Sequence, residues 1–534
     1  MNIIDDIILH SPALIVAIPL LGAFLTPLVS KINDKLRNIF VIFIVLFTSA
    51  IVLLLANDIY LVCGKIHTYV FGGNAPITEG GFAIRILFEV DGLNIFMALI
   101  ATILAIAGVI YSWAFMKENT GLDKYYTLYL LMIAGMYGMI LTGDMFNFFV
   151  FLEITSIASC ALIAFWTNKG KAIDAGFKYI VVSATGALFV LFAIAILYGQ
   201  YNALNMAVLA SKIQFSFLDK IALVILISGL AMKAGIVPMH MWLPDAYGRA
   251  PASVTLILVG VTQASLYGAL RMIFTLYGGK LTTTMNQIGD VSIDLNLVLG
   301  IFIVGLALLT IFIGVLMALK ENNFKRMIAF AAVAEIGYMI LAIGAALTTV
   351  FSTNDAGTGM MALKGGVFHI LNDALDVGLL FLVAGAIYYA TKETSLNQLG
   401  GLARNMKYTT IFFLIGLLAV SGMPPMNGFA SKLIIYESTY QVNPILSIIA
   451  ILCSILLLAV FVKVFHSAFL GPKLPKFDNV KEVPKSMLLA MGIIATIIIF
   501  IGLFPDMVVN YIVQPAVNAL TNNSNYISNV IGGI

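Results

Sequence analysis

Apolar runs near 20 residues long recur along the whole chain, separated by short clusters of charged and turn-forming residues. Because a helix needs about 20 apolar residues to cross the hydrocarbon core of a bilayer, each run predicts a membrane-spanning helix. Dividing the chain at the polar clusters gives about fourteen predicted spans, centred near residues 21, 49, 100, 136, 156, 188, 229, 263, 307, 338, 374, 418, 457 and 495. The pattern therefore predicts an all-α polytopic membrane protein.

Two of these spans are interrupted by glycine and proline within the apolar run. The first contains Lys233 and Pro238 in AMKAGIVP, and the second contains Pro424, Pro425 and Lys432 in SGMPPMNGFASK. A proline removes a backbone donor and opens the helix. Paired interruptions of this kind are typical of transporters built from two repeats, where they mark an ion or substrate pathway.

Composition agrees with this class of protein and excludes several others. Hydrophobic residues make up 61% of the chain and charged residues 10%, and the formal charge of +3 gives no basis for nucleic-acid binding. No Walker A sequence is present, and no GxGxxG follows a strand-like segment, so no motif binds a nucleotide phosphate. The three cysteines lie far apart without a CxxC pair. We therefore expect no cofactor, no metal site and no catalytic centre in this chain.

The distribution of basic residues predicts an orientation. With residue 1 placed outside, 19 of the 29 basic residues fall in connections on the cytoplasmic side and 5 on the opposite side. This asymmetry satisfies the positive-inside rule, with both termini outside the cytoplasmic membrane of a prokaryote. The basic residues that remain lie within or at the edges of spans: Lys233, Arg271, Lys364, Lys432 and Lys463.

Ionisable residues inside spans are costly, at roughly 2.5 to 3.5 kcal/mol on insertion scales, and therefore need a partner or a function. Glu153 lies in the fifth span and Lys233 in the seventh. Burial and a nearby carboxylate act in opposite directions on the proton affinity of a lysine, so a Glu–Lys pair of variable separation suits a proton relay. The alternatives are a structural ion pair for Glu153 and a lysine that extends to the cytoplasmic interface for Lys233.

The second half of the chain carries a similar set of groups. Glu335 lies about 13 Å into the tenth span, counting 1.5 Å per residue from Arg326. His369, Asp373 and Asp376 share one face of the eleventh span and predict a polar path there. The alternative is a packing network in which His369 and Asp373 satisfy each other. Near the end of the thirteenth span, Lys463 is either part of a proton exit or an interfacial anchor.

Three segments resemble motifs of one family over roughly residues 80 to 470. They are HMWLPDAYGRAPASV at 240–254, FKRMIAFAAVAEIGYM at 324–339 and SGMPPMNGFASK at 421–432. They are similar to the antiporter-like subunits shared by respiratory complex I, energy-converting membrane-bound hydrogenases and the Mrp cation/proton antiporters. The resemblance places Glu153, Lys233 and Lys432 on the family's pathway positions, and we include His240, which opens the first motif.

The resemblance also implies an architecture and partners. It implies fourteen helices with two inverted five-helix repeats, in which helices 7 and 12 are broken. The expected divisions are 1–115 for three N-terminal spans, 125–278 and 295–470 for the repeats, and 485–534 for the last span and tail. The implied partners are other membrane subunits, H⁺ and possibly Na⁺, with Fe–S clusters and a metal redox site held by partner subunits.

The chain departs from the family pattern at several positions. Thr262 and Gln263 stand where a basic residue is expected in the eighth span, Asp373 and Val377 replace a histidine and a lysine, and Glu335 replaces a common glutamine. Three functions remain open: a membrane-arm subunit that moves protons or Na⁺ when a partner redox module changes conformation, an Mrp-type secondary antiporter, and a non-conducting structural subunit.

Overall fold

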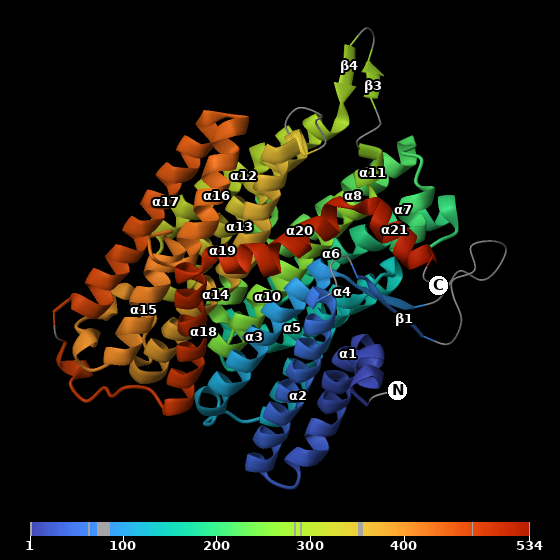
Figure 1. Ribbon diagram of the computed structural model, residues 1–534. Coiled ribbons are helices and arrows are strands. Elements are labelled where there is room, and N and C mark those ends of the chain that lie inside the picture. The colour runs from blue at the N-terminus through green and yellow to red at the C-terminus, as the bar shows by residue number, and fades with distance from the viewer. Residues whose placement is uncertain are drawn as a thin grey trace.

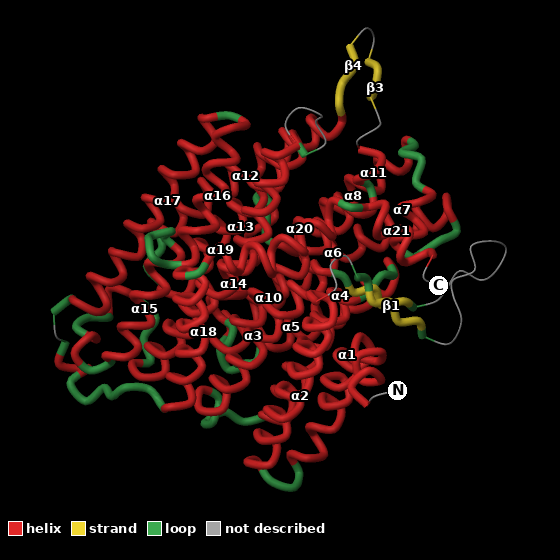
Figure 2. Tube along the Cα trace, viewed as in Figure 1, coloured by secondary structure: helices red, strands yellow, loops and turns green. Residues whose placement is uncertain are grey.

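The computed structural model describes residues 3–61, 65–71, 86–281, 285–288, 291–350, 356–472 and 474–532. Long helices form one bundle, and the hairpin β3–β4 projects from it (Figure 1). Figure 2 shows how little of the described chain is strand. The two short antiparallel hairpins pair His67 with Val90 and Met285 with Asp294 at their ends, and the sequence pattern did not predict them.

The elements follow the chain in four groups. The N-terminal group contains α1 (Ile3–Ser30), α2 (Asp34–Leu61), β1 (His67–Val70), β2 (Leu87–Val90) and α3 (Gly92–Phe115). The first half continues with α4 (Leu122–Leu141), α5 (Met145–Ile163), α6 (Gly170–Tyr201), α7 (Met206–Lys212), α8 (Phe217–Ala234), η1 (Met239–Met241), α9 (Trp242–Arg249), α10 (Ala252–Leu270), η2 (Arg271–Leu276) and α11 (Gly278–Leu281).

The second half begins with β3 (Met285–Ile288) and β4 (Val291–Asp294), followed by α12 (Leu295–Lys320), α13 (Phe324–Thr349), α14 (Ala356–Thr391), η3 (Leu396–Gln398), η4 (Leu402–Arg404), α15 (Lys407–Val420), α16 (Asn427–Val442), α17 (Pro444–Val464), η5 (Phe465–Leu470) and η6 (Pro475–Phe477). The C-terminal group contains α18 (Lys485–Leu503), α19 (Pro505–Val508), η7 (Val509–Val513), α20 (Gln514–Thr521) and α21 (Asn523–Gly532).

Among the described residues, twelve helices are long and apolar enough to cross a membrane. They coincide with twelve of the predicted spans, so the chain is a multi-pass membrane protein. The other two predicted spans, near residues 136 and 418, fall on α4 and on the α15–α16 pair. Helix α4 carries four tyrosines and two charges in its 20 residues, and α15 ends after 14 residues at the proline break. Both features lower the length or apolarity of the continuous helix.

Burial is highest in α13 and α14, which carry Glu335 and the His369, Asp373 and Asp376 group. In α13 and α14, the most apolar stretch of 18 residues is 100% buried, against 33% in α1. Many large apolar side chains of α1, α2, α6 and α12 are exposed, as contact with lipid requires. The charged helices α13 and α14 therefore lie in the centre of the bundle, shielded from lipid by their neighbours.

Both glycine-proline interruptions break their helices. Helix α8 ends at Gly235, whose φ of +78° suits glycine, and helix resumes at Met239. Helix α15 ends before Gly422, with φ of +68°, and α16 starts at Asn427. The breaks release carbonyl groups that would otherwise be bonded within a helix.

The C-terminal helices link distant parts of the fold. Helix α20 packs against α3 and α14, and α21 packs against α7 and η2 (Figure 1). At the tail, the Tyr526 hydroxyl donates a hydrogen bond to Glu89 at the end of β2, and Asn205 donates to the other carboxylate oxygen. The tail thus closes one end of the first half of the bundle.

Candidate functional site

In the first half, Lys233 lies on the last turn of α8, next to the break. Its Nζ is 3.7 Å from Oε1 of Glu153 on α5 and donates a 2.6 Å hydrogen bond to Oγ of Ser156. The lysine side chain is 5% exposed and the glutamate 29%. The pair is therefore in contact but not hydrogen-bonded, and Oε1 of Glu153 has no hydrogen-bonding partner within the described residues.

Backbone groups released at the break after α8 form hydrogen bonds with neighbouring helices. The Met232 carbonyl accepts a 2.9 Å hydrogen bond from the indole Nε1 of Trp242 on α9. The backbone N–H of Val237 donates to Thr310 on α12, which belongs to the other half of the chain. Buried His240 sits in the short turn between α8 and α9, and its Nδ1 lacks a partner within the described residues. Lys233 thus lies at the end of a helix whose backbone is hydrogen-bonded to residues of both halves of the chain.

A small enclosed cavity of about 10 Å³ lies beside Lys233. Its polar lining comes from α5, α6, α8 and α10: Thr155, Ser156, Tyr179, Ser183, Lys233, Thr262 and Ser265. A volume of about 10–15 Å³ is what one water molecule needs, and the hydroxyls supply the hydrogen-bonding partners. Hydroxyl groups therefore extend from Lys233 to Thr262, the position where a basic residue is expected from the family pattern.

At the middle of the bundle, α10 meets α14 through a polar contact. The amide Nε2 of Gln263 donates a 2.5 Å hydrogen bond to Oδ2 of Asp373. At the preceding residue of α10, the hydroxyls of Thr262 and Tyr247 lie 2.9 Å apart. Gln263 and Asp373 are 1% and 3% exposed. This contact joins the first half of the chain to the second across 110 residues of sequence.

In the second half, Glu335 on α13 lies between two side chains, Lys432 and His369, and contacts both. Its Oε1 accepts a 2.8 Å hydrogen bond from Lys432 Nζ on α16, and its Oε2 lies 2.9 Å from His369 Nε2 on α14. None of the three side chains is more than 1% exposed. The Lys432 ammonium also donates to the Val420 carbonyl, released at the α15 break, and lies 4.5 Å from the centre of the Tyr338 ring. This cluster is completely removed from lipid.

The other ring nitrogen of the histidine continues the network. His369 Nδ1 lies 3.0 Å from Ser431 Oγ, which also accepts a hydrogen bond from Asn372. The packing network in which His369 and Asp373 satisfy each other is therefore wrong, because these residues bond to different partners. Around the α15–α16 break, several buried polar atoms lack partners within the described residues; they belong to Asn372, Asp373, Asp376, Ser421 and Asn427. Such atoms are commonly satisfied by ordered water.

The structure brings most of the predicted residues into one row and leaves two, His240 and Lys463, outside it. The row runs from Glu153 and Lys233 through the Gln263–Asp373 contact to His369, Glu335 and Lys432. Asp376 adjoins it on α14, close to Gly428. Lys463, in contrast, is exposed on α17 and donates to the Leu319 carbonyl.

A further buried polar cluster was missed by the sequence analysis, apart from Arg271. Arg271 lies 2.8 Å from Asp91 and donates to Asn94 at the start of α3. Glu89 lies beside it, held by Tyr526 and Asn205. Burial raises the pKa of Glu89 to about 7 despite these hydrogen bonds. Asp91 caps α3, and its carboxylate accepts from the N–H groups of Leu93 and Asn94, a pattern that could have been recognised as an N-cap.

No group of three or more His, Cys, Asp or Glu side chains positioned to hold a metal ion occurs among the residues that the structure describes. The site consists of buried ionisable and hydrogen-bonding side chains.

Comparison with known proteins gives a consistent assignment. The sequence model described as NADH:quinone oxidoreductase/Mrp antiporter, TM, matches residues 142–458, and that of NADH-Ubiquinone oxidoreductase (complex I), chain 5 N-terminus, matches residues 77–126. The chain is 29% identical to NADH-quinone oxidoreductase subunit N of Desulforudis audaxviator, covering 95% of this chain and 98% of that protein. It is 29% identical to an Na(+)/H(+) antiporter subunit of Alkalihalophilus pseudofirmus, covering 82% of this chain and 85% of that one.

A solved structure shares the fold over nearly the whole length. A chain of the membrane-bound sulfane sulfur reductase, an archaeal respiratory membrane complex, superimposes with a TM-score of 0.83 at 28% identity, covering 97% of this chain and 99% of that chain.

The buried cluster predicts a specific stability pattern. Glu335→Gln leaves Lys432 without its anionic partner in the interior, and we expect it to lower the free energy of unfolding by about 3–5 kcal/mol. The double variant E335Q/K432M removes both charges and should lose less stability than E335Q alone. Denaturant unfolding of the purified chain measures both. Glu437→Gln, at an exposed position of the same helix α16, is the matched control and should stay within about 0.5 kcal/mol of the original chain. Equal losses in E335Q and the double variant would contradict the pairing.

The raised pKa of Glu89 predicts a pH dependence. Between about pH 4.5 and about pH 7, the folded chain keeps the Glu89 proton that the unfolded chain has lost. This contribution to the free energy of unfolding is present in full below that window and is lost as the pH rises through it. Glu89→Gln, which stays neutral throughout, should therefore show a smaller fall in Tm than the original chain between pH 5 and pH 8. Glu437→Gln should follow the original chain, and parallel curves for all three proteins would refute the prediction.

Proposed function

This chain belongs to the NADH:quinone oxidoreductase/Mrp antiporter family, and we propose that it is a membrane-arm subunit that translocates protons, or exchanges Na⁺ for protons, in a complex driven by a redox module. An energy-converting hydrogenase or a related oxidoreductase is the partner in this proposal. The observation that carries it is the row of buried groups that joins a Glu–Lys pair in one half of the chain to a second Glu–Lys pair in the other half.

Inverted five-helix repeats account for the position of both pairs. The first repeat comprises α4, α5, α6, the broken α8–α9 and α10; the second comprises α12, α13, α14, the broken α15–α16 and α17. Glu153 and Glu335 then lie on the second helix of each repeat, and Lys233 and Lys432 lie on the fourth, broken helix. With the three N-terminal spans and α18, this scheme gives fourteen spans in total.

The two pairs differ in a way that suits a relay. The Glu335–Lys432 contact is a 2.8 Å hydrogen bond between side chains that are 1% exposed. The Glu153–Lys233 distance is 3.7 Å, and Glu153 is 29% exposed. Since charge separation in a weakly polar interior changes proton affinity strongly, lengthening or shortening either distance moves a proton along the row. The looser pair is where a proton enters or leaves.

Hydroxyl groups and water carry the proton between the pairs in this proposal. The cavity beside Lys233 reaches Thr262, and the Gln263–Asp373 contact follows on the same helix. Thr262 and Gln263 stand where the resemblance to the family leads us to expect a basic side chain. The orientation with both termini outside, and metal redox centres carried by partner subunits, complete the proposal.

A second candidate is an Mrp-type secondary antiporter subunit. The 29% identity to the Na(+)/H(+) antiporter subunit of Alkalihalophilus pseudofirmus favours it. The two functions differ in their energy source. Na⁺/H⁺ exchange by vesicles that receive no electron donor supports the antiporter, whereas proton movement only during electron transfer supports the redox-coupled subunit.

Neutralising either member of the Glu153–Lys233 pair should uncouple proton pumping from electron transfer. We expect Glu153→Gln or Lys233→Ala to reduce proton pumping by the intact complex at least tenfold, while electron transfer in uncoupled membranes is retained. Pumping is measured by the quenching of a pH-sensitive dye in vesicles, and electron transfer by donor consumption with an uncoupler. Glu437→Gln is the control, and undiminished pumping in E153Q would rule out the proposed path.

The proposed role of the Thr262 hydroxyl in proton transfer can be tested separately. Thr262→Val keeps the shape of the side chain but removes the hydroxyl, and we expect it to slow pumping several-fold, whereas Thr262→Ser should retain it. Thr348→Val on α13 is the matched control, because the Thr348 hydroxyl bonds only to the Ala345 carbonyl of its own helix. If T262V pumps as fast as T348V, the proton does not pass this hydroxyl.

A further inference from the structure

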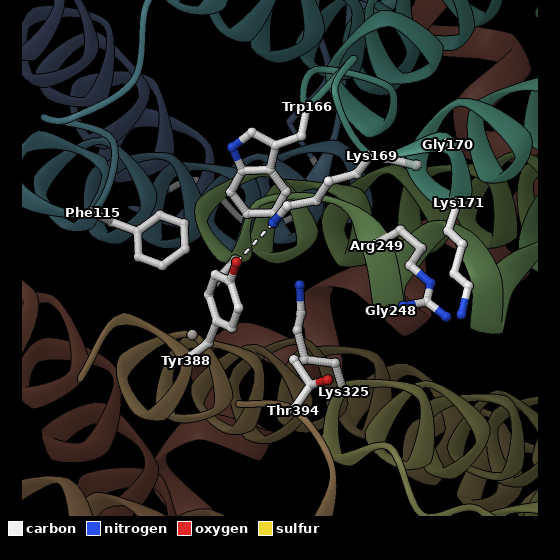
Figure 3. A pocket seen from close by; sticks show the side chains of 13 residues that line it. Phe115, Trp166, Lys169, Gly170, Lys171, Gly248, Arg249, Lys325, Tyr388 and Thr394 are labelled. Atoms are coloured by element: carbon white, nitrogen blue, oxygen red, sulfur yellow. Dashed lines mark hydrogen bonds between the residues drawn. The ribbon is translucent and has the colours of Figure 1, made fainter. Parts of the chain in front are cut away.

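A larger cavity, of about 310 Å³, lies away from the charged row, between the two halves of the chain. Lys169, Lys171 and Arg249 come from the first half, and Lys325 and Tyr388 from the second. Figure 3 shows Lys169 reaching the Tyr388 hydroxyl past the Trp166 ring, with the Lys325 side chain extending toward the same space. Four cations thus gather around one cavity, and its lining contains no carboxylate.

These cations have no anionic partner within the part of the chain that the structure describes. The nearby carboxylates are engaged elsewhere: Asp245 pairs with Lys178 and Arg326, and Glu321 pairs with Arg326. Lys169 bonds to the Tyr388 hydroxyl at 2.7 Å and lies 4.1 Å from the Trp166 ring centre. Lys325 is 6% exposed and donates only to neutral oxygens, the Ala250 carbonyl and the Thr255 hydroxyl. Positive charge here is stabilised by dipoles and aromatic rings, which leaves it available to an anion.

The start of α6 adds to the positive potential. Gly170, Lys171 and Ala172, its first three residues, line the cavity. The N-cap residue, Lys169, supplies no side-chain acceptor to the first turn of this 32-residue helix. The helix dipole at such a position favours a bound anion, and side-chain cations already surround the space beside it.

The position of the cavity along the helices suits a lipid headgroup. It is surrounded by the ends of spanning helices: the end of α3 at Phe115, the start of α6 at Gly170, the start of α13 next to Lys325, and the last turns of α14 at Tyr388. Trp166 and Tyr388 are the aromatic types that favour the membrane interface. Clusters of Lys and Arg at this depth are typical of sites for anionic headgroups.

We propose that this cavity binds a phosphate group, held by Lys169, Lys171, Arg249 and Lys325, and that the phosphate belongs to an anionic phospholipid. The bound group links the α9–α10 corner of the first half to α13 and α14 of the second. It thereby stabilises the contact between the halves whether or not the chain conducts protons.

The test measures binding of lipid to the purified full-length chain. The delipidated protein is titrated with phosphatidylglycerol, phosphatidylcholine or inorganic phosphate, and binding is followed by native mass spectrometry and by the shift in Tm. We expect one tightly bound phosphatidylglycerol that phosphatidylcholine does not replace. The double variant K169Q/K171Q should weaken this binding at least about tenfold, since hydrogen bonds to charged groups contribute roughly 1.5–3 kcal/mol each.

A matched control separates the site from general charge. K117Q/K124Q removes two exposed lysines outside the cavity, one from the α3–α4 connection and one from the first turn of α4, and should bind phosphatidylglycerol like the original chain. Arg249→Gln is a second test if K169Q/K171Q folds poorly. Stabilisation by millimolar inorganic phosphate alone, lost in K169Q/K171Q, would identify the ligand as free phosphate. Equal affinity for both lipids, or equal loss in the site and control variants, would overturn the proposal.

Discussion

The buried Glu335 carboxylate is the constraint around which the centre of this protein is arranged. A charge with 1% exposure inside a membrane bundle is tolerated only when it is neutralised and hydrogen-bonded, and Lys432 and His369 do both. These contacts fix α13, α14 and α16 relative to one another. They also require the break between α15 and α16, because the Val420 carbonyl released there takes a further hydrogen bond from Lys432. Apolar helices around this centre then separate it from lipid.

The first half also contains a Glu–Lys pair, but its two side chains are not hydrogen-bonded to each other. Lys233 is bonded to the neutral Ser156, and Glu153 remains 3.7 Å away and partly exposed. The two halves thus hold one closed, buried Glu–Lys pair and one open, partly exposed pair. The break after α8 contacts the other half through Thr310 on α12, whereas the α15–α16 break is bonded to α14 within its own half, so a displacement between the halves would alter the surroundings of Lys233.

Sequence predicted the helices better than the contacts between them. Long apolar runs and the Gly–Pro breaks follow from local chemistry, so twelve spans and both interruptions could be read directly. Partners such as Glu335 and Lys432, 97 residues apart, depend on how helices pack, which periodicity does not encode. The shared helical face of His369 and Asp373 suggested that they bond to each other, but each meets a different helix. Glu89 and Asp91 were missed because they lie just before a span, where charged residues ordinarily face water.

Thr262, Gln263 and Asp373, which lie between the two Glu–Lys pairs, depart from the family pattern in a mutually compatible way. The family pattern predicts a basic residue at position 262 or 263 and a histidine at position 373. These two side chains could lie in contact only if one of them were neutral. Here the neutral amide of Gln263 donates to one carboxylate oxygen of Asp373, so this contact forms without a cation. The adjoining space is lined by the hydroxyls of Ser156, Ser183, Thr262 and Ser265 and has room for about one water. An insulating spacer would fill this position with apolar side chains, which carry no hydrogen bonds. Retained hydroxyls beside a buried lysine therefore favour a path that uses water in place of the missing base.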